Sequence, residues 1–268
     1  MVTTSSLVSS LISNSKDAAT PWLSCRRSSP SGRVRLFCFP YAGAGALIFR
    51  AWGSCLPTTV EVCPVQLPGH GSRMKEPPFT SLGPLVSDAA AALLPHLGER
   101  FAFFGHSMGA LIAFELARLL RREHCLMPCH LFISGAPAPQ LQRTGPITYD
   151  LPDTEFLGTL RELNGTPKEV LEERDLMQVL LPLLRADFAV CQTYEYVNDI
   201  PLPCPITAFG GMDDAEASRE RVEAWCAQTI SGFSLHLLPG DHFFLHSQHA
   251  FMLRMLAREL RDLTERDG

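Results

Sequence analysis

The sequence lacks the features that mark several large classes of protein. No stretch approaches the roughly 18 consecutive apolar residues that a membrane-spanning helix requires, so a helical membrane protein is excluded. Basic residues are not in excess, because 23 Lys and Arg stand against 28 Asp and Glu. A protein that binds nucleic acid by neutralising phosphates is therefore disfavoured. With 19 Gly and 21 Pro in 268 residues, the chain also falls short of low-complexity composition.

Two further absences concern the compartment. The nine cysteines are odd in number and scattered, and no CxxC pair is present. Cys38 and Cys63 lie within apolar runs, where cysteine behaves as a small buried hydrophobic residue. The first residues show no basic segment followed by an apolar one, as a secretory signal would. We therefore expect a reduced, cytoplasmic protein.

What is present is enough apolar sequence for a sizeable core, 46% of the residues against 19% charged. Residues 1–31 are Ser-rich without periodic hydrophobicity and are predicted to be a loosely ordered leader, on which Trp22 and Leu23 dock against the domain. A transit peptide is the alternative, although the first 25 residues contain one Lys and no Arg. Residues 32–268 are predicted to form the folded domain.

Short apolar runs alternate with amphipathic segments from residue 34 onward. The runs are typical of strands buried on both faces. They span residues 34–39, 60–65, 101–104, 131–134, 205–210 and 233–238. Helical spacing of apolar residues is found from Leu82 to Leu97, with Ser81 placed as a cap, and from Met252 to Leu263. This alternation predicts an α/β fold with a mostly parallel sheet flanked by helices on both sides.

One interval is too long for an ordinary crossover between strands. Seventy residues separate Gly135 from Pro205, and they contain two segments with helical spacing, the second of which includes Pro182. We interpret residues 139–200, approximately, as an inserted helical lid.

The strongest local motif is Gly105-His106-Ser107-Met108-Gly109, which follows an apolar run and opens the segment ALIAFELARLL. A G-x-S-x-G sequence between a strand and a helix is typical of a nucleophile elbow, in which a serine occupies a strained turn. The helix that follows would direct free N–H groups toward an oxyanion formed beside the serine. Ser107 is therefore the candidate nucleophile.

A serine hydroxyl needs a general base, and the sequence offers nine histidines. His106 adjoins Ser107 and is expected to pack beside the turn, because adjacent side chains do not easily reach each other. His242 follows the predicted strand at residues 233–238, which places it at the carboxyl ends of the strands, where α/β sheets gather their sites. We predict that His242 is the base.

The carboxylate that orients this base is expected in the loop after the strand at residues 205–210. Asp213 and Asp214 both lie there, and either could instead cap the following helix. We favour Asp214 and leave Asp213 open. The resulting chain order of Ser, Asp and His matches that of the α/β-hydrolases and differs from the chymotrypsin and subtilisin orders.

A second oxyanion donor is expected in the Gly-rich segment FPYAGAG, residues 39–45. The backbone N–H of Ala42, together with that of Met108, is our candidate pair. The segment lacks the Lys-Ser/Thr pair of a P-loop, and its glycines do not have the spacing of a dinucleotide fingerprint. We predict no cofactor and no metal site.

Six ordered blocks of the sequence resemble a known family, the type II thioesterases of polyketide and nonribosomal peptide synthesis. They are FCFPYAGAGALIFRAW, VQLPGHGSRMKEPP, FAFFGHSMGALIAFELAR, ELNGTPKEVLEERDLMQVLLPLLRADF, FGGMDD and LPGDHFFL, and they extend over about residues 34–260. The resemblance implies an α/β-hydrolase fold, a mobile lid over an acyl-binding chamber, and a triad of Ser107, Asp214 and His242. The family usually has Gly at the position of Asp241, which could perturb the pKa of the base, and Pro at that of Ala215.

The resemblance also implies a function: hydrolysis of acyl groups stalled or misprimed on the phosphopantetheine arm of acyl- or peptidyl-carrier protein domains, through an acyl-enzyme. A medium-chain acyl-carrier hydrolase with the same residues is the nearest alternative. A carboxylesterase and a non-catalytic binding protein are more distant ones. Arg118, Arg121 and Arg122 could meet an acidic carrier, although an exposed helix face is the simpler interpretation. Nothing in the sequence requires more than a monomer.

Overall fold

The structure is a computed structural model of the whole chain, and it describes residues 20–24, 34–98, 100–163, 165 and 167–265. Most of the predicted leader, residues 1–31, lies outside this part of the chain.

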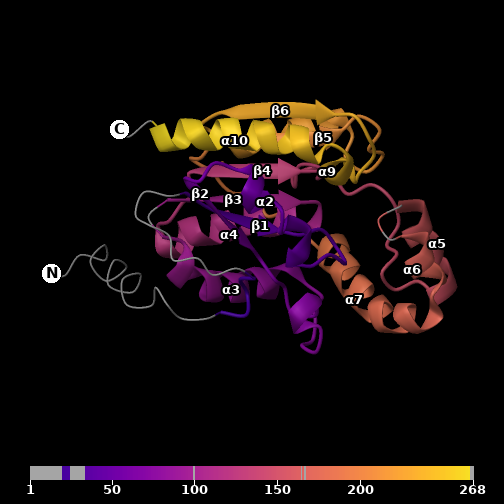
Figure 1. Cartoon of the computed structure of the whole chain (residues 1–268). Coiled ribbons are helices and arrows are strands. Elements are labelled where there is room, and N and C mark those ends of the chain that lie inside the picture. Colours follow the sequence, from indigo (N-terminus) through magenta and orange to yellow (C-terminus); the bar gives the residue numbers. More distant parts are fainter. Residues whose placement is uncertain (1–19, 25–33, 99, 164, 166, 266–268) are drawn as a thin grey trace.

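A six-stranded sheet forms the centre of the molecule (Figure 1). Its strands lie in the order β2-β1-β3-β4-β5-β6, and every neighbouring pair is parallel. The strands are β1 (Val34–Phe39), β2 (Val60–Pro64), β3 (Phe101–His106), β4 (His130–Ser134), β5 (Ile206–Gly211) and β6 (Phe233–Leu238). All six predicted runs are strands, and the predicted parallel sheet flanked by helices is confirmed.

Alternation of side chains along the strands supplies two separate apolar layers. In β1, Phe37 and Phe39 belong to one buried cluster, whereas Leu36 and Cys38 belong to another. Strands β3, β4 and β5 are buried along their whole length, which explains why their sequences are continuously apolar.

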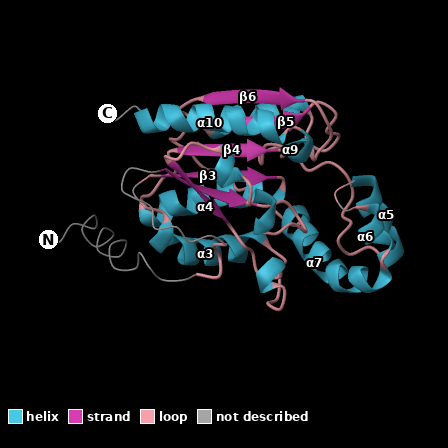
Figure 2. Cartoon of the chain, in the orientation of Figure 1, coloured by secondary structure: helices cyan, strands magenta, loops and turns pink. Residues whose placement is uncertain are grey.

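Helices cover both layers of the sheet (Figure 2). Helices α3 (Leu82–Leu93), α4 (Met108–His124) and α8 (Arg219–Glu223) contribute to the first cluster. Helices α2 (Trp52–Cys55), α9 (Phe244–Ser247) and α10 (His249–Glu265) contribute to the second. Single 3₁₀ turns occur at Ala46–Phe49, Gly71–Arg73, Leu94–His96 and Ala224–Gln228. In the described part of the chain, no helix combines the length and apolar character needed to cross a membrane.

The predicted cap of α3 is wrong in its detail. Ser81 has the extended backbone of an N-cap residue, but its side chain makes no capping hydrogen bond. The helix also ends earlier than the apolar spacing indicates, because Pro95 follows at the start of a 3₁₀ turn over Leu94–His96. The apolar face of α3 therefore holds this helix in place without a side-chain cap.

The long interval between β4 and β5 is helical, as expected. It contains α5 (Asp153–Leu163), α6 (Lys168–Glu172) and α7 (Arg174–Gln192), with Pro182 inside α7. We call residues 139–200 the insertion. Phe156, Leu160, Leu171, Met177 and Leu184 form a buried cluster of its own, separate from the two layers of the sheet. In Figure 1 these helices lie beside the ends of the strands.

The N-terminal segment docks where the sequence predicts it. Trp22 is 6% exposed and packs in the first cluster, and Leu23 forms an antiparallel bridge with Val65, just beyond β2. The guanidinium carbon of Arg73 lies 4.8 Å from the centre of the Trp22 ring. A cation over an aromatic face adds a favourable electrostatic contact to this apolar burial.

The separate cluster of the insertion generates a prediction about stability. Phe156→Ala should destabilise the insertion by about 3–5 kcal/mol, because it empties the centre of that cluster, and should speed proteolytic cleavage within residues 139–200. The control is Phe132→Ala in β4, which should instead lower the midpoint temperature of the main calorimetric transition. If both variants lowered this midpoint temperature equally, the insertion would not have a core of its own.

Candidate active site

Ser107 stands at a strained turn between β3 and α4. Its φ of +54° is rare for a residue with a side chain, and its N–H donates to the Ser134 carbonyl over 2.8 Å. A Cβ on Gly105 would lie 2.1 Å from the carbonyl oxygen of Gly109, and a Cβ on Gly109 would lie 2.1 Å from that of Phe39. The two glycines of the motif are thus required by the close approach of backbone to backbone.

Three predicted residues from distant parts of the sequence meet at this turn. The Ser107 Oγ lies 3.0 Å from His242 Nε2, and His242 Nδ1 lies 2.8 Å from Asp214 Oδ2. Ser107 follows β3, Asp214 follows β5, and His242 lies in the loop after β6. Parallel strands end at one edge of the sheet, which is why these loops meet. Asp213 is not part of the hydrogen-bonded chain and is exposed.

The Asp214 carboxylate determines which nitrogen of the His242 ring carries the proton. Because a carboxylate only accepts, His242 donates its Nδ1–H to Asp214, and the neutral ring presents the unprotonated Nε2 to the Ser107 hydroxyl. Burial lowers the pKa of His242, but the hydrogen bond and charge of Asp214, with the charges of Glu216 and Asp241, outweigh it and raise the pKa above 6.5. Asp241, the residue that departs from the family pattern, therefore stabilises the imidazolium.

Asp214 is held in place by backbone groups. Its Oδ1 accepts from the N–H groups of Glu216 and Ala217 at 2.9 and 3.0 Å, and its side chain is 0% exposed. Burial raises the pKa of Asp214. The hydrogen bond and charge of His242 and the two N–H groups lower the pKa by more than burial raises it, so the net shift is downward. The alternative role as a helix cap does not apply, since Ser218 occupies the N-cap position of α8.

The two residues whose backbone N–H groups are predicted as oxyanion donors, Met108 and Ala42, both lie close to the serine. Met108 is the first residue of α4, so its N–H has no partner within the helix, and Ala42 lines the same pocket as Ser107. The loop that carries Ala42 is stabilised by a hydrogen bond within it, in which the Ala44 N–H donates to the Tyr41 carbonyl over 3.0 Å. It is also braced by the Ala46 N–H, which donates to Gln66 Oε1 over 3.2 Å.

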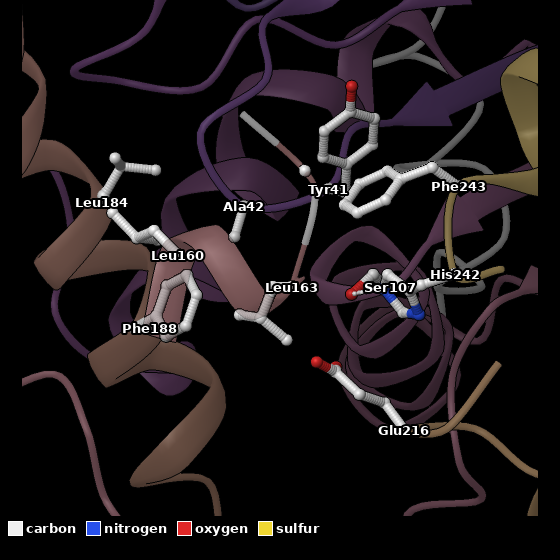
Figure 3. Close-up of a pocket in the computed structure, with 11 residues that line it drawn as sticks. Tyr41, Ala42, Ser107, Leu160, Leu163, Leu184, Phe188, Glu216, His242 and Phe243 are labelled. Atoms are coloured by element: carbon white, nitrogen blue, oxygen red, sulfur yellow. Dashed lines mark hydrogen bonds between the residues drawn. The ribbon is translucent and has the colours of Figure 1, made fainter. Parts of the chain in front are cut away.

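A largely apolar pocket adjoins the serine (Figure 3). The insertion supplies Leu160, Leu163, Leu184 and Phe188, and the sheet loops supply Tyr41 and Phe243. In Figure 3 the Glu216 carboxylate points toward the space between Leu163 and the Ser107–His242 pair. A group attached to Ser107 Oγ would lie against side chains of the insertion.

Sequence reasoning missed Tyr41, Glu216 and Phe243 as parts of the site. Glu216 is two residues beyond Asp214, in a loop with no pattern that distinguishes one acid from another. Tyr41 adjoins the predicted donor Ala42, and its hydroxyl lies 2.9 Å from His246 Nε2. Phe243 directly follows His242. For Tyr41 and Phe243, the position next to a predicted site residue was therefore the sequence feature that could have indicated a place in the site.

His106 packs beside the turn, as expected. It is fully buried, its Nδ1 lies 2.9 Å from the Ser134 Oγ, and its ring centre is 5.3 Å from that of His242. Burial and the nearby His242 hold the pKa of His106 well below its usual value, so this ring is neutral. Because His106 is neutral, it places no positive charge next to His242.

The expected exposed arginine face is only partly present. Arg118 is 5% exposed and pairs with Glu115 at 2.6 Å, while Arg121 pairs with Asp199 at 2.6 Å. Both guanidinium groups also donate to backbone carbonyls at the end of the insertion, those of Val197 and Ile200, so they hold that segment against α4. Arg122, in contrast, is exposed.

Within the part of the chain that the structure describes, no three His, Cys, Asp or Glu side chains gather in a way that could hold a metal ion.

The charges around the base generate a prediction. Glu216→Gln should lower the pKa of His242, because it removes a negative charge that stabilises the imidazolium. Titration of the His242 ring by NMR would measure the shift. The matched control is Asp213→Asn, an exposed neighbour whose charge is not among the causes of the His242 shift. An unchanged or higher His242 pKa in Glu216→Gln would contradict this assignment.

Two curated proteins are similar to this chain over most of its length. Linear gramicidin dehydrogenase LgrE of Brevibacillus parabrevis is 47% identical, over 90% of this chain and 92% of its own length. Gramicidin S biosynthesis protein GrsT of Aneurinibacillus migulanus is 46% identical, over 90% of this chain and 94% of its own.

A solved structure extends the comparison to the fold. The RedJ thioesterase of the prodiginine pathway in Streptomyces coelicolor superposes with a TM-score of 0.81 at 40% identity, covering 90% of this chain and 96% of its own. Residues 34–261 match the Thioesterase domain family. The chain therefore belongs to the thioesterase domain family and is a hydrolase of the α/β-hydrolase fold.

Proposed function

We propose that this enzyme hydrolyses acyl thioesters on the phosphopantetheine arm of carrier proteins, and so removes stalled or misprimed acyl groups from polyketide or nonribosomal peptide synthases. The observation on which the proposal rests is the hydrogen-bonded chain from Ser107 through His242 to Asp214 at the end of an apolar pocket. The relatives named above, which belong to gramicidin and prodiginine pathways, support the choice of synthase.

The reaction begins when His242 Nε2 takes the proton of Ser107, whose Oγ attacks the thioester carbonyl carbon. The carbonyl oxygen becomes an oxyanion, which the N–H groups of Ala42 and Met108 stabilise by about 3 kcal/mol each. The C–S bond then breaks. The thiolate leaves readily, because its pKa of about 8.5 is far below that of an alcohol, and takes up the proton held by His242.

Hydrolysis of the acyl-enzyme repeats these steps with water. His242 takes a proton from the water, whose oxygen attacks the acyl carbon, and the ester bond to Ser107 breaks. The proton returns to Ser107 Oγ, and the free acid departs. In both halves the Asp214 carboxylate stabilises the imidazolium and holds its ring in orientation.

The pH dependence follows from the state of the base. His242 must be neutral to accept a proton, so activity is lost as the pH falls through its pKa. Since that pKa is raised, the acid limb of the pH–rate profile should lie above pH 6.5.

A second candidate is a medium-chain acyl-carrier hydrolase, and the apolar lining of the pocket favours it. Leu160, Leu163, Leu184 and Phe188 would pack along a hydrocarbon chain without any polar requirement. The triad serves both candidates equally, so only the length preference for the acyl group separates them.

The triad assignment predicts a graded set of losses. Ser107→Ala should lower thioester hydrolysis by several orders of magnitude, and Asp214→Asn should lower kcat by up to about 10⁴-fold, because the imidazole loses its orienting charge. Asp213→Asn is the matched control and should keep near-normal turnover. The measurement is release of free acid from acyl-carrier protein, with circular dichroism to verify folding. Near-normal turnover by Ser107→Ala would overturn the mechanism.

The choice of substrate has its own test. Rates on acetyl-, aminoacyl- and decanoyl-loaded carrier protein should be similar for an editing enzyme, which benefits from low selectivity. Mass spectrometry of the carrier before and after the enzyme reports each rate. A strong preference for the decanoyl group would instead assign the medium-chain function. A comparable rate on small esters, with no gain from the carrier, would assign a carboxylesterase.

A further inference from the structure

A buried carboxylate on the insertion reaches the loop of the expected oxyanion donor. Asp187, in the second half of α7, accepts from the Gly43 N–H over 2.6 Å with its Oδ2. The same oxygen lies 2.8 Å from His70 Nε2, in the loop after β2. Asp187 is 3% exposed and His70 is 2% exposed, so these contacts form away from water. None of the three residues is required by the triad.

Both nitrogens of His70 face acceptors. Nδ1 lies 2.9 Å from the carbonyl oxygen of Pro68, and Nε2 faces the Asp187 carboxylate. A carbonyl and a carboxylate cannot donate, so both ring nitrogens must carry protons to make these two hydrogen bonds. His70 is therefore an imidazolium, and it forms a buried ion pair with Asp187.

Packing links the same segment of α7 to both loops. A Cβ on Gly43, whose φ is +81°, would lie 2.6 Å from Leu184 Cδ2. A Cβ on Gly69, beside His70, would lie 3.2 Å from Leu183 Cδ1. Two adjacent leucines of the helix thus contact the backbone of the two loops that Asp187 joins by hydrogen bonds. The contact has both a polar and a steric component, and both depend on the position of α7.

We propose that Asp187 and His70 are positioning residues that couple the seating of α7 to the backbone of the loop carrying Ala42. This inference rests on the proposed function, in which the Ala42 N–H stabilises the oxyanion. Gly43 is the next residue along, so its hydrogen bond to Asp187 limits how the Ala42 backbone can turn. With α7 seated, the donor is aligned before substrate arrives, which is the condition for electrostatic stabilisation of the oxyanion.

The ion pair makes this coupling sensitive to alkali. Burial lowers the pKa of His70, but the hydrogen bond and charge of Asp187 and the Pro68 carbonyl outweigh it and raise the pKa above 6.5. On α7, Cys191 also faces Asp187, and burial with that charge raises the pKa of its thiol, which stays neutral. The contribution of the pair is complete below pH 6.5 and is lost as the pH rises through the raised His70 pKa.

The kinetic test uses two variants and one control. Asp187→Asn and His70→Gln should lower kcat about ten- to hundredfold on a small acyl thioester, because the donor is misplaced, while KM changes far less. Each should also lose the alkaline limb of the wild-type pH–rate profile. Asp153→Asn is the matched control, because it breaks the exposed Asp153–Arg185 ion pair on the same insertion. Normal kcat in both folded variants, or an unchanged alkaline limb, would overturn the proposal.

A second measurement covers the case in which the variants do not fold. NMR titration of the His70 ring in the wild-type enzyme should show an imidazolium that loses its proton above pH 6.5. Deprotonation of His70 at or below that pH would remove the ion pair and with it the proposal. This titration requires no substrate, so it tests the coupling even if carrier thioesters prove not to be the substrate.

Discussion

The site depends on one strained turn, in which Ser107 holds a positive φ between β3 and α4. The turn lifts the hydroxyl out of the sheet and starts a helix directly beside it, so the proposed nucleophile and the proposed backbone donor share one turn. It is possible because Gly105 and Gly109 let three backbone segments approach within distances that any side chain would block. The surrounding core, buried along the whole of β3, supplies the rigidity that maintains the strain.

The parallel sheet brings together the other residues of the proposed triad. Ser107 and His242 are 135 residues apart in the chain, yet both follow strands whose carboxyl ends lie at the same edge. The carboxylates near the base then set its chemistry. Asp214 fixes the tautomer, and Glu216 and Asp241 add negative charge that favours the imidazolium. The negative charges that raise the pKa of His242 thus come from the loops after β5 and β6.

The insertion performs two tasks for this site. Its α5 and α7 contribute apolar side chains to the pocket, and its Asp187 reaches the loops after β1 and β2. In the proposed function, an acyl chain that displaced α7 would therefore affect the oxyanion donor as well as the volume of the pocket. Substrate fit and catalytic alignment are coupled through one helix, as expected where a binding element is also part of the catalytic scaffold.

The sequence by itself determined the six strands, the helical insertion and the candidates Ser107 and His242, because these depend on local periodicity and on motifs that a few adjacent residues define. It favoured Asp214 without excluding Asp213, placed a cap at Ser81 that makes no side-chain hydrogen bond, and took Arg118 for a surface residue. It gave no sign of Glu216 in the pocket or of the Asp187–His70 pair. Only the tertiary structure decided these contacts. They join residues that are 28 to 144 positions apart in the chain, so they depend on how the loops converge, and no local sequence pattern encodes that convergence.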